Sequence, residues 1–264
     1  MTTSLVVRTG RYVAKVAAIA DMDMRKLRHD PTELLTRAIQ PMLWLLVFGQ
    51  VFARAHSIPT GNVDYTAFLV PGILAQSVLF VAIFNGISVI WERDLGIVHK
   101  FLASPTPRTA LVLGKALASG VRALTQAVIV YAVAMALGVP LVWTAQALLG
   151  VVALVLLGAA LFSTFSLIIA CIVKTRERFM GIGQVLTMPL FFASNAIYPI
   201  SLMPTWLRAI ARANPLSYEV DGLRTLMLSS GQSQFGLAFD LAALALGLCL
   251  CVVVATRMYP RLTQ

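Results

Sequence analysis

The sequence predicts an all-α integral membrane fold, organised as a single domain over residues 1–264. Hydrophobic residues make up 59% of the chain and charged residues 12%, whereas a soluble domain carries about 25% charged residues. Apolar runs recur along the whole length, with no polar block long enough for a separate catalytic domain. Six runs approach the roughly 20 apolar residues that a membrane-spanning helix needs. They are residues 38–54, 67–90, 110–137, 145–173, 180–198 and 236–257.

The distribution of lysine and arginine predicts the orientation, because cytoplasmic loops carry the excess of these residues. With the N-terminus in the cytoplasm, the inside regions hold sixteen of the 21 basic residues and the outside regions hold four. The sixteen are Arg8, Arg11, Lys15, Arg25, Lys26, Arg28, Arg37, Arg93, Lys100, Arg108, Lys115, Lys174, Arg176, Arg178, Arg257 and Arg261. The four are Arg54, Arg208, Arg212 and Arg224. An even number of spans then places both termini in the cytoplasm, in a multi-pass protein of the cytoplasmic membrane.

Residues 10–30 are expected to form an amphipathic helix along the inner membrane surface. Its apolar positions follow helical spacing and are Val13, Val16, Ala20, Met24 and Leu27. Asp30, Pro31 and Glu33 are typical of an N-cap and first turn, so the helix is expected to restart there. Pro41 is expected to kink the first span, because proline lacks a backbone N–H.

The segment Trp91–Arg108 is strongly polar and lies between the second and third expected spans. Its apolar residues recur at the 4-3-4 spacing of one helical stripe, and they are Trp91, Leu95, Val98 and Leu102. Pro105 and Pro107 cannot continue a helix, so one short cytoplasmic helix is expected at residues 91–107. Periodicity leaves two interpretations open: a helix that only rests on the membrane surface, or a docking surface for a cytoplasmic partner.

Two short helices are expected on the outer side, within residues 199–231. The first would cover residues 204–213, and the second begins at Asn214 and Pro215, a cap followed by proline at the first helical position. Each is too short to span a bilayer, which predicts a re-entrant or surface helix pair. The charged residues of the second helix are Glu219, Asp221 and Arg224, and a solvated surface cluster is one interpretation of them.

Polar residues within the spans have two interpretations each. Arg122, with Gln126 one turn later, either extends to the inner interface or lines an inward-facing cavity or a dimer contact. Phe191, Phe192 and Asn195 near the outer end of the fifth span belong either to an interfacial aromatic belt or to an exit path.

The remaining composition points to no nucleic-acid or metal partner. The basic residues behind the net charge of +10 lie beside apolar runs instead of on one soluble face. Cys171, Cys249 and Cys251 lie inside apolar runs without metal-ligand spacing, so they are expected to be buried and inert.

Four segments, in this order, resemble the transmembrane subunits of ABC-2 exporters, the group that contains daunorubicin-type drug-efflux permeases. They read "LVPGILAQSVLF", "WERDLGIVHKFLASPTPR", "LVLGKAL" and "NAIYPISLMPTWLRAIARANPLSYEVDGLR", and the resemblance covers nearly the whole chain. It implies that residues 91–107 are the coupling helix, which fits into a groove of a separate ATPase subunit. The contact residues that it implies are Glu92, Arg93, Asp94, His99 and Lys100.

The same resemblance implies the remaining site residues and partners. The fifth span would lie near the central pathway, with Asn195 as the best candidate, and Glu219, Asp221 and Arg224 would help to close an outer gate. Partners would be two ATPase subunits, a second permease copy or paralogue, and membrane lipid. The sequence has no G-x-x-x-x-G-K-[ST] motif, so ATP and magnesium are expected on the ATPase and no cofactor on this chain. The expected cargo of this alternating-access exporter is amphipathic: a drug, a lipid or a lipid-linked glycan.

Two rival functions fit the sequence less well. An ion-gradient-driven carrier is expected to hold intramembrane carboxylates or broken helices at the midplane, but the six expected spans hold only Asp240, near an end. A membrane enzyme needs a catalytic set facing one leaflet, whereas His29, His56 and His99 are assigned to different loops. A transport subunit is therefore predicted, not an enzyme.

Overall fold

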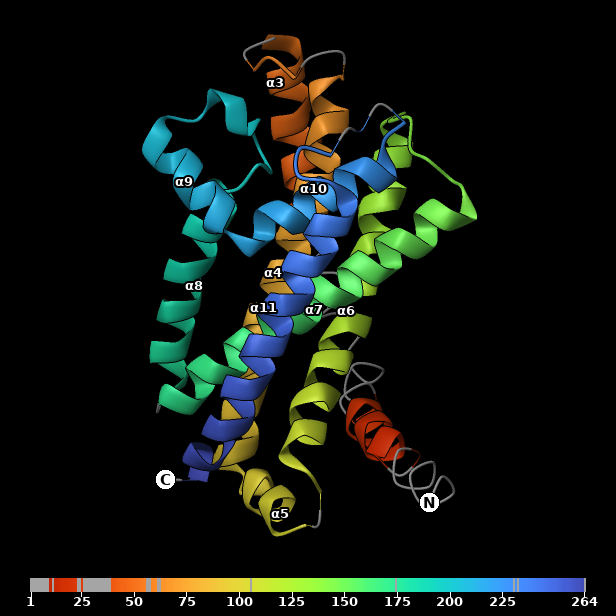
Figure 1. The fold of residues 1–264 in the computed structure, drawn as a ribbon. Coiled ribbons are helices and arrows are strands. Elements are labelled where there is room, and N and C mark those ends of the chain that lie inside the picture. The colour runs from red at the N-terminus through yellow and green to blue at the C-terminus, as the bar shows by residue number, and fades with distance from the viewer. Residues whose placement is uncertain are drawn as a thin grey trace.

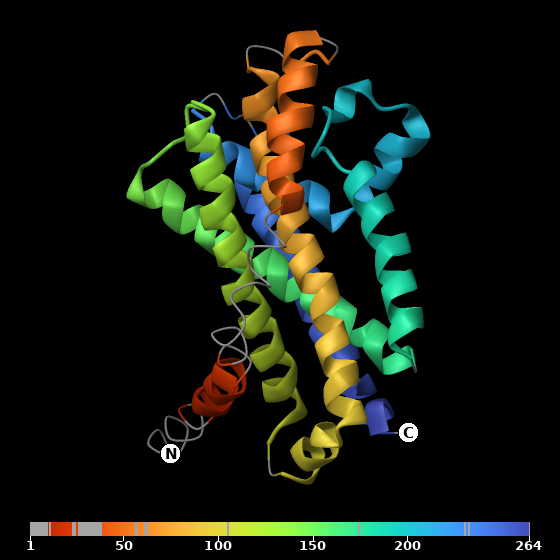
Figure 2. The ribbon, with the colours of Figure 1, turned by 180° about the vertical axis from the view of Figure 1, so that it is seen from behind.

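The computed structural model describes residues 10, 12–22, 25, 39–55, 58–60, 63–104, 106–173, 175–229, 231 and 233–263. These residues are nearly all helical, and the long helices run between two ends of an elongated molecule (Figure 1). Residues 12–22, the short helix α5 and the C-terminal turn lie at one end, whereas α3, α9 and α10 lie toward the other (Figures 1 and 2). Several residues with expected roles lie outside the described ranges, among them Met24, Leu27, Asp30, Pro31, Glu33 and Pro105.

Within the described ranges, four helices are long and apolar enough to cross a membrane. They are α4 (Tyr65–Asp94), α6 (Arg108–Ala136), α7 (Ala145–Ile172) and α11 (Leu237–Met258). Two further expected spans correspond to shorter helices. Ile39–Ala55 is apolar, and α8 (Arg176–Phe192, 17 residues) carries three charged residues in its first turn. The structure thus has four clear span candidates where the sequence predicts six.

Helix α8 overlaps with the expected span at residues 180–198, but it begins earlier, at Arg176, and ends earlier, at Phe192. Thr175 caps its N-terminus. At the other end, Ser194 Oγ donates to the Phe191 carbonyl at 2.7 Å, and Asn214 Nδ2 donates to the Leu190 carbonyl at 2.6 Å. These side chains satisfy carbonyl groups that a continuing helix would have bonded.

Asn214 also starts the second outer helix. The outer segment contains a short turn, η2 (Ile200–Leu202), followed by α9 (Thr205–Ala213) and α10 (Pro215–Met227). The Oδ1 atom of Asn214 accepts the Leu216 N–H at 3.0 Å, which is an N-cap bond. One side chain therefore caps both the end of α8 and the start of α10.

We expect Asn214→Ala to lower the free energy of unfolding by about 1–3 kcal/mol, because it removes the cap of α10 and leaves buried carbonyls of α8 unpaired. Asn214→Asp is the matched control, since it keeps the cap acceptor and loses only the amide donor. Thermal unfolding of the detergent-purified chain should rank native, Asp and Ala variants in that order. Equal midpoints for all three would show that the double cap contributes nothing.

Helix α4 occupies the centre of the bundle and packs against α6, α7, α8 and α10 (Figure 2). Two glycines permit this packing. A Cβ atom at Gly72 would overlap with the backbone of Ala196, and one at Gly86 would overlap with Ser166 and Phe179. Close approach of neighbouring elements therefore requires glycine at both positions.

The N-terminal residues follow the expected pattern only in part. Residues 12–22 are helical, and Ile19 and Ala20 are buried, whereas Val13 of the expected apolar stripe is exposed. Gly114 of α6 faces Ile19, so this helix packs against α6. A π-helical turn, η1 (Trp44–Gly49), begins three residues after Pro41.

The helix expected at residues 91–107 is two helices. Helix α4 continues to Asp94, Gly96 adopts a left-handed conformation with φ of 71°, and α5 covers Ile97–Ala103. Glycine tolerates positive φ, so it ends α4 and turns the chain. The apolar stripe is divided as a result: Val98 is buried, whereas Leu95 is 66% exposed.

Burial of the cysteines also differs from expectation. Cys171 is buried, Cys251 is half-buried, and Cys249 is exposed on α11. Much of the surface of α11 is apolar and exposed, which is typical of a helix that faces lipid.

Candidate functional site

The junction of α4 with α5 is held by a buried ion pair. Lys115 Nζ on α6 lies 2.6 Å from Glu92 Oε1 on α4, and each side chain is 3% exposed. The resemblance implies Glu92 as a partner contact, but this side chain points inward because its face of α4 packs on α6. Glu92 therefore positions the α4–α5 turn relative to α6.

A second group of contacts joins the same turn to the start of α8. Asp94 Oδ2 accepts a hydrogen bond from Arg176 Nη2 at 2.8 Å, and Asp94 Oδ1 accepts one from Arg93 Nη2 at 3.0 Å. The Arg176 guanidinium also lies 3.5 Å from the centre of the Trp91 ring. Arg93 Nη1 donates to the Val173 carbonyl at 3.3 Å. Arg93 and Asp94, expected as partner contacts, are thus engaged within the chain.

His99 and Lys100 lie on α5, at the tip of the molecule, and both are exposed (Figure 1). Leu95 beside them is exposed as well. An exposed tip that combines apolar and charged side chains can contact another protein. Of the five expected contact residues, His99, Lys100 and Asp94 are exposed, and Asp94 is at the same time bonded to Arg93 and Arg176.

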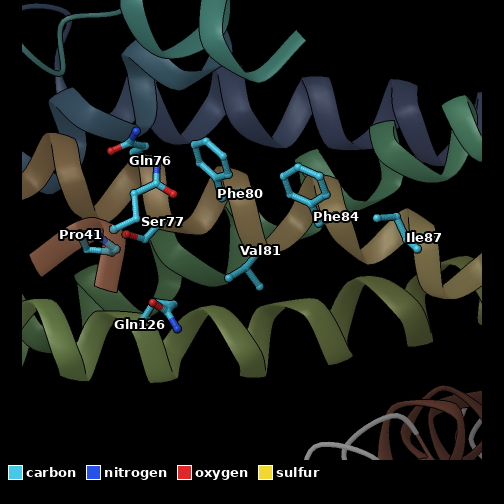
Figure 3. A pocket seen from close by; sticks show the side chains of 9 residues that line it. Pro41, Gln76, Ser77, Phe80, Val81, Phe84, Ile87 and Gln126 are labelled. Carbon is cyan, nitrogen blue, oxygen red and sulfur yellow. The ribbon is translucent and has the colours of Figure 1, made fainter. Parts of the chain in front are cut away.

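A cavity of about 330 Å³ lies between the helix Ile39–Ala55, α4 and α6 (Figure 3). Its walls combine aromatic and aliphatic side chains with a few polar groups, and they include Gln40, Pro41, Gln76, Ser77, Phe80, Val81, Phe84, Ile87 and Gln126. Figure 3 shows Ser77 on the side of α4 toward Gln126 of α6, whereas Gln76 lies on α4 farther from α6. This mixture is typical of a binding site for an amphipathic molecule.

Two of the three amide side chains of this cavity, Gln76 and Gln126, are buried. Within the described part of the chain, neither Oε1 nor Nε2 of Gln126 has a hydrogen-bond partner. A buried amide without partners costs free energy, and a ligand that accepts and donates hydrogen bonds would recover part of it. Sequence analysis singled out Gln126 only beside Arg122 and missed Gln76, whose signal was a lone polar residue within an apolar run.

Within the described residues, Arg122 of α6 is hydrogen-bonded, directly or through Asn85, to polar side chains of two neighbouring helices. Its Nη1 donates to Asn85 Oδ1 at 2.7 Å, and Asn85 Nδ2 donates to Ser163 Oγ at 3.2 Å. These two hydrogen bonds connect α6, α4 and α7 inside the bundle. Arg122 is not among the residues that line the cavity. Polar groups within a bilayer need partners inside the protein, which is what Asn85 and Ser163 provide.

At the outer end of α8, the three candidate pathway residues separate into core and surface. Phe191 is fully buried against Trp44, with ring centres 5.6 Å apart, whereas Phe192 is exposed. Asn195 is buried, and its carbonyl accepts a hydrogen bond from Arg224 Nη2 at 2.8 Å. The Arg224 guanidinium also lies 3.9 Å from the centre of the Phe68 ring.

Glu219, Asp221 and Arg224 are buried, so the solvated surface cluster is wrong. Asp221 Oδ2 accepts hydrogen bonds from Ser233 Oγ at 2.7 Å and from the Gln234 N–H at 2.8 Å. Glu219 packs against Gly158 of α7, and burial raises the pKa of this carboxyl well above its ordinary value. Within the described residues no ion pair joins these three side chains to one another, because each contacts a different element.

Metal ligands do not gather in the described ranges, where no group of three His, Cys, Asp or Glu side chains could hold an ion. The candidate site has three parts. The first is the cavity between α4 and α6, and the second is the hydrogen-bonded set Arg122, Asn85 and Ser163. The third is the α5 tip, which contacts with α6 and α8 hold in place.

Comparison with known proteins assigns the class. Residues 14–228 match the family model described as ABC-2 type transporter, so the chain belongs to this family. It is 29% identical over 220 residues to the ycf38 transport permease of Cyanophora paradoxa, which covers 81% of this chain and 76% of that protein. It is also 29% identical over 208 residues to the daunorubicin resistance ABC transporter permease protein DrrB1 of Streptomyces coeruleorubidus, with 77% and 71% covered. Nodulation protein J of Rhizobium leguminosarum bv. viciae is 23% identical over 233 residues, with 86% of each chain covered.

Membership of this family has direct consequences. The chain is a multi-pass membrane transport component, and ATP hydrolysis takes place on a separate ATPase chain. Members of the family work with ATPase subunits and generally as dimers.

Proposed function

We propose that this chain is the permease subunit of an exporter that moves an amphipathic substrate out across the cytoplasmic membrane by alternating access. The substrate class would be a drug, a lipid or a lipid-linked glycan. The cavity with its two buried amides carries this proposal, because apolar walls with a few hydrogen-bonding groups suit a molecule with both characters.

The proposed topology has six membrane crossings with both termini in the cytoplasm. Residues 12–22, α5 and the C-terminal turn η3 (Tyr259–Thr263) lie at the same end of the molecule, as an even number of crossings requires (Figure 1). Helix α8 and the helix Ile39–Ala55 would supply the fifth and first crossings, and about 17 residues is the lower limit for a span. The excess of basic residues in the proposed cytoplasmic regions supports this orientation.

Two ATPase subunits, each with ATP and magnesium, would drive the transport cycle from the α5 end. His99 and Lys100 would contact the ATPase directly. Glu92, Arg93 and Asp94 would act indirectly, because their ion pairs and hydrogen bonds attach the tip to α6 and to the α7–α8 region. Movement of the tip would then reach the helices around the cavity as a rigid-body displacement.

A second permease copy or paralogue would complete the pathway. One face of α8 packs on α4 through Phe179, Gly183, Thr187 and Phe191, whereas the opposite face is exposed and includes Val185 and Phe192. A short helix with a polar first turn and an exposed face is better covered by protein than by lipid. Asn195 with Phe191 and Phe192 would lie along the exit, and Glu219, Asp221 and Arg224 would stabilise the closed outer gate from inside the protein.

An ion-gradient-driven carrier is the alternative, and the site does not favour it. Such a carrier needs a titrating group that faces the substrate pathway. The buried carboxyls Glu219 and Asp240 lie on α10 and α11, and neither lines the cavity between α4 and α6.

Substitution in the cavity tests the proposal. Gln126→Leu and Gln76→Leu should each lower ATP-dependent transport of daunorubicin or of a fluorescent phospholipid by about two- to tenfold, because each removes hydrogen bonds to the cargo. The measurement is uptake into inside-out vesicles that contain the permease and its ATPase. Gln146→Leu is the matched control, since Gln146 is exposed at the start of α7. Native uptake of both probes by both cavity variants would contradict the proposed site.

A further inference from the structure

A second cavity, of about 510 Å³, lies on a different face of the bundle from the first. Leu161 and Phe165 of α7 line it, Leu190 of α8 contributes a wall, and Gly247 and Leu250 of α11 contribute another. Apart from the Tyr218 hydroxyl, its lining side chains are apolar or those of glycine, proline and cysteine. The first cavity, by contrast, has three polar amides and a serine. The second cavity therefore suits a purely hydrocarbon occupant.

The position of this cavity relative to the bilayer indicates a lipid chain. Its α11 wall belongs to a helix long and apolar enough to cross a membrane. Leu246 and Leu250 beside the opening are 63% and 60% exposed, as expected of side chains in contact with lipid. The hydrocarbon region that a spanning helix crosses supplies lipid chains instead of water, and an empty space would forfeit dispersion contacts, so a flexible acyl chain is the expected occupant.

One end of the cavity offers a place for a lipid headgroup. Ala213 and Tyr218 line that end, and the Tyr218 hydroxyl donates a hydrogen bond to the carbonyl of Arg212. Arg212 is exposed at the end of α9, directly before Ala213. Tyr218 also packs against Phe235 and Phe239, with ring centres 5.1 and 5.7 Å away. Aromatic rings beside an exposed arginine are typical of the boundary between acyl chains and headgroups.

We propose that this cavity binds one phospholipid of the leaflet in which α9 and α10 lie, with an acyl chain between α8 and α11 and the phosphate at Arg212. The arginine supplies the charge that a phosphate requires, and the cavity supplies a matching apolar wall. The inference rests on the proposed membrane insertion but not on the cargo or on ATP coupling. Such a lipid would fill the space between α8 and α11 and stabilise their separation.

Native mass spectrometry of the full-length chain, purified in mild detergent and titrated with phosphatidylglycerol, tests the proposal. The native chain should retain one tightly bound phospholipid. Gly247→Phe fills the cavity, and a Cβ atom there meets only the flexible end of Leu161, at 3.3 Å. This variant should lose the tight adduct, and Arg212→Glu should weaken binding by about fivefold. Val253→Trp and Arg54→Glu are matched controls, because both residues are exposed away from the cavity, and they should bind as the native chain does.

The outcomes are distinct. Equal retention of phosphatidylglycerol by the native chain, Gly247→Phe and Arg212→Glu would overturn the proposal. Dissociation of a dimer into monomers by Gly247→Phe, with lipid binding unchanged, would make the cavity a subunit contact and would also overturn it. If Gly247→Phe does not fold, Arg212→Glu and Leu190→Trp decide the question. The assay needs no transport, so its failure is separate from a failure of the proposed function.

Discussion

Glu92→Ala is expected to lower the free energy of unfolding by about 3–5 kcal/mol, because it leaves the ammonium group of Lys115 buried without its carboxylate. Lys115→Met should have an effect of similar size for the complementary reason. Thermal unfolding of the purified chain measures both variants, and the yield of folded protein should fall with them. A loss of this size would also remove transport, since little folded permease would remain.

A double variant separates the ion pair from general damage. Glu92→Leu combined with Lys115→Met removes both charges and keeps the side-chain volumes similar, so it should recover a large part of the stability that either single variant loses. Arg108→Met is a control at an exposed position near the start of α6. Additive losses in the double variant would show that Glu92 and Lys115 contribute independently, contrary to the geometry.

Arg176→Ala and Asp94→Ala are expected to lower ATP-dependent transport on the order of tenfold, a loss of about 1.4 kcal/mol in coupling, while ATP hydrolysis continues. The bond between these side chains joins the α4–α5 turn to α8 and is partly exposed, so it contributes about 0.2–1 kcal/mol to stability and the fold should survive its loss. The measurement is the ratio of cargo moved to ATP hydrolysed in proteoliposomes that contain the permease and its ATPase.

Arg178→Ala is the matched control for this uncoupling, because Arg178 is exposed in the same first turn of α8. It should leave the ratio unchanged. A native ratio in both Arg176→Ala and Asp94→Ala would show that the tip does not act on α8 through this contact. A parallel fall in hydrolysis and transport would instead indicate that the ATPase no longer binds.

Several elements could be predicted because their signals are local. Hydropathy locates α4, α6, α7 and α11, since a helix in lipid needs a long apolar run whatever its neighbours are. The start of α10 at Asn214 and Pro215 follows from cap chemistry within a few residues. Helix α8 was harder to place, because its ends depend on side chains such as Asn214 that reach it from a distant segment.

The site residues were less predictable, for a related reason. The spacing from Trp91 to Leu102 predicts one continuous helix, but Gly96 interrupts it and separates α4 from α5. Asp94 accepts a hydrogen bond from Arg176 of α8, and Arg122 donates one to Asn85 of α4. These partners come from other helices, so local sequence does not reveal them. The interpretation of Glu219 and Asp221 as a solvated cluster assumes that charged residues are exposed, but α7 and the segment before α11 cover them.

The amino-acid sequence by itself determined the class of this protein: an all-helical ABC-2 permease whose hydropathy, charge distribution and ordered motifs need no contacts to be recognised. Only the tertiary structure decided what its polar residues do. Glu92 pairs with Lys115, and Gln76 and Gln126 line one cavity, because α4 and α6 pack against each other. Hydropathy is a property of a segment, whereas an ion pair or a cavity depends on how two segments far apart in the chain are packed.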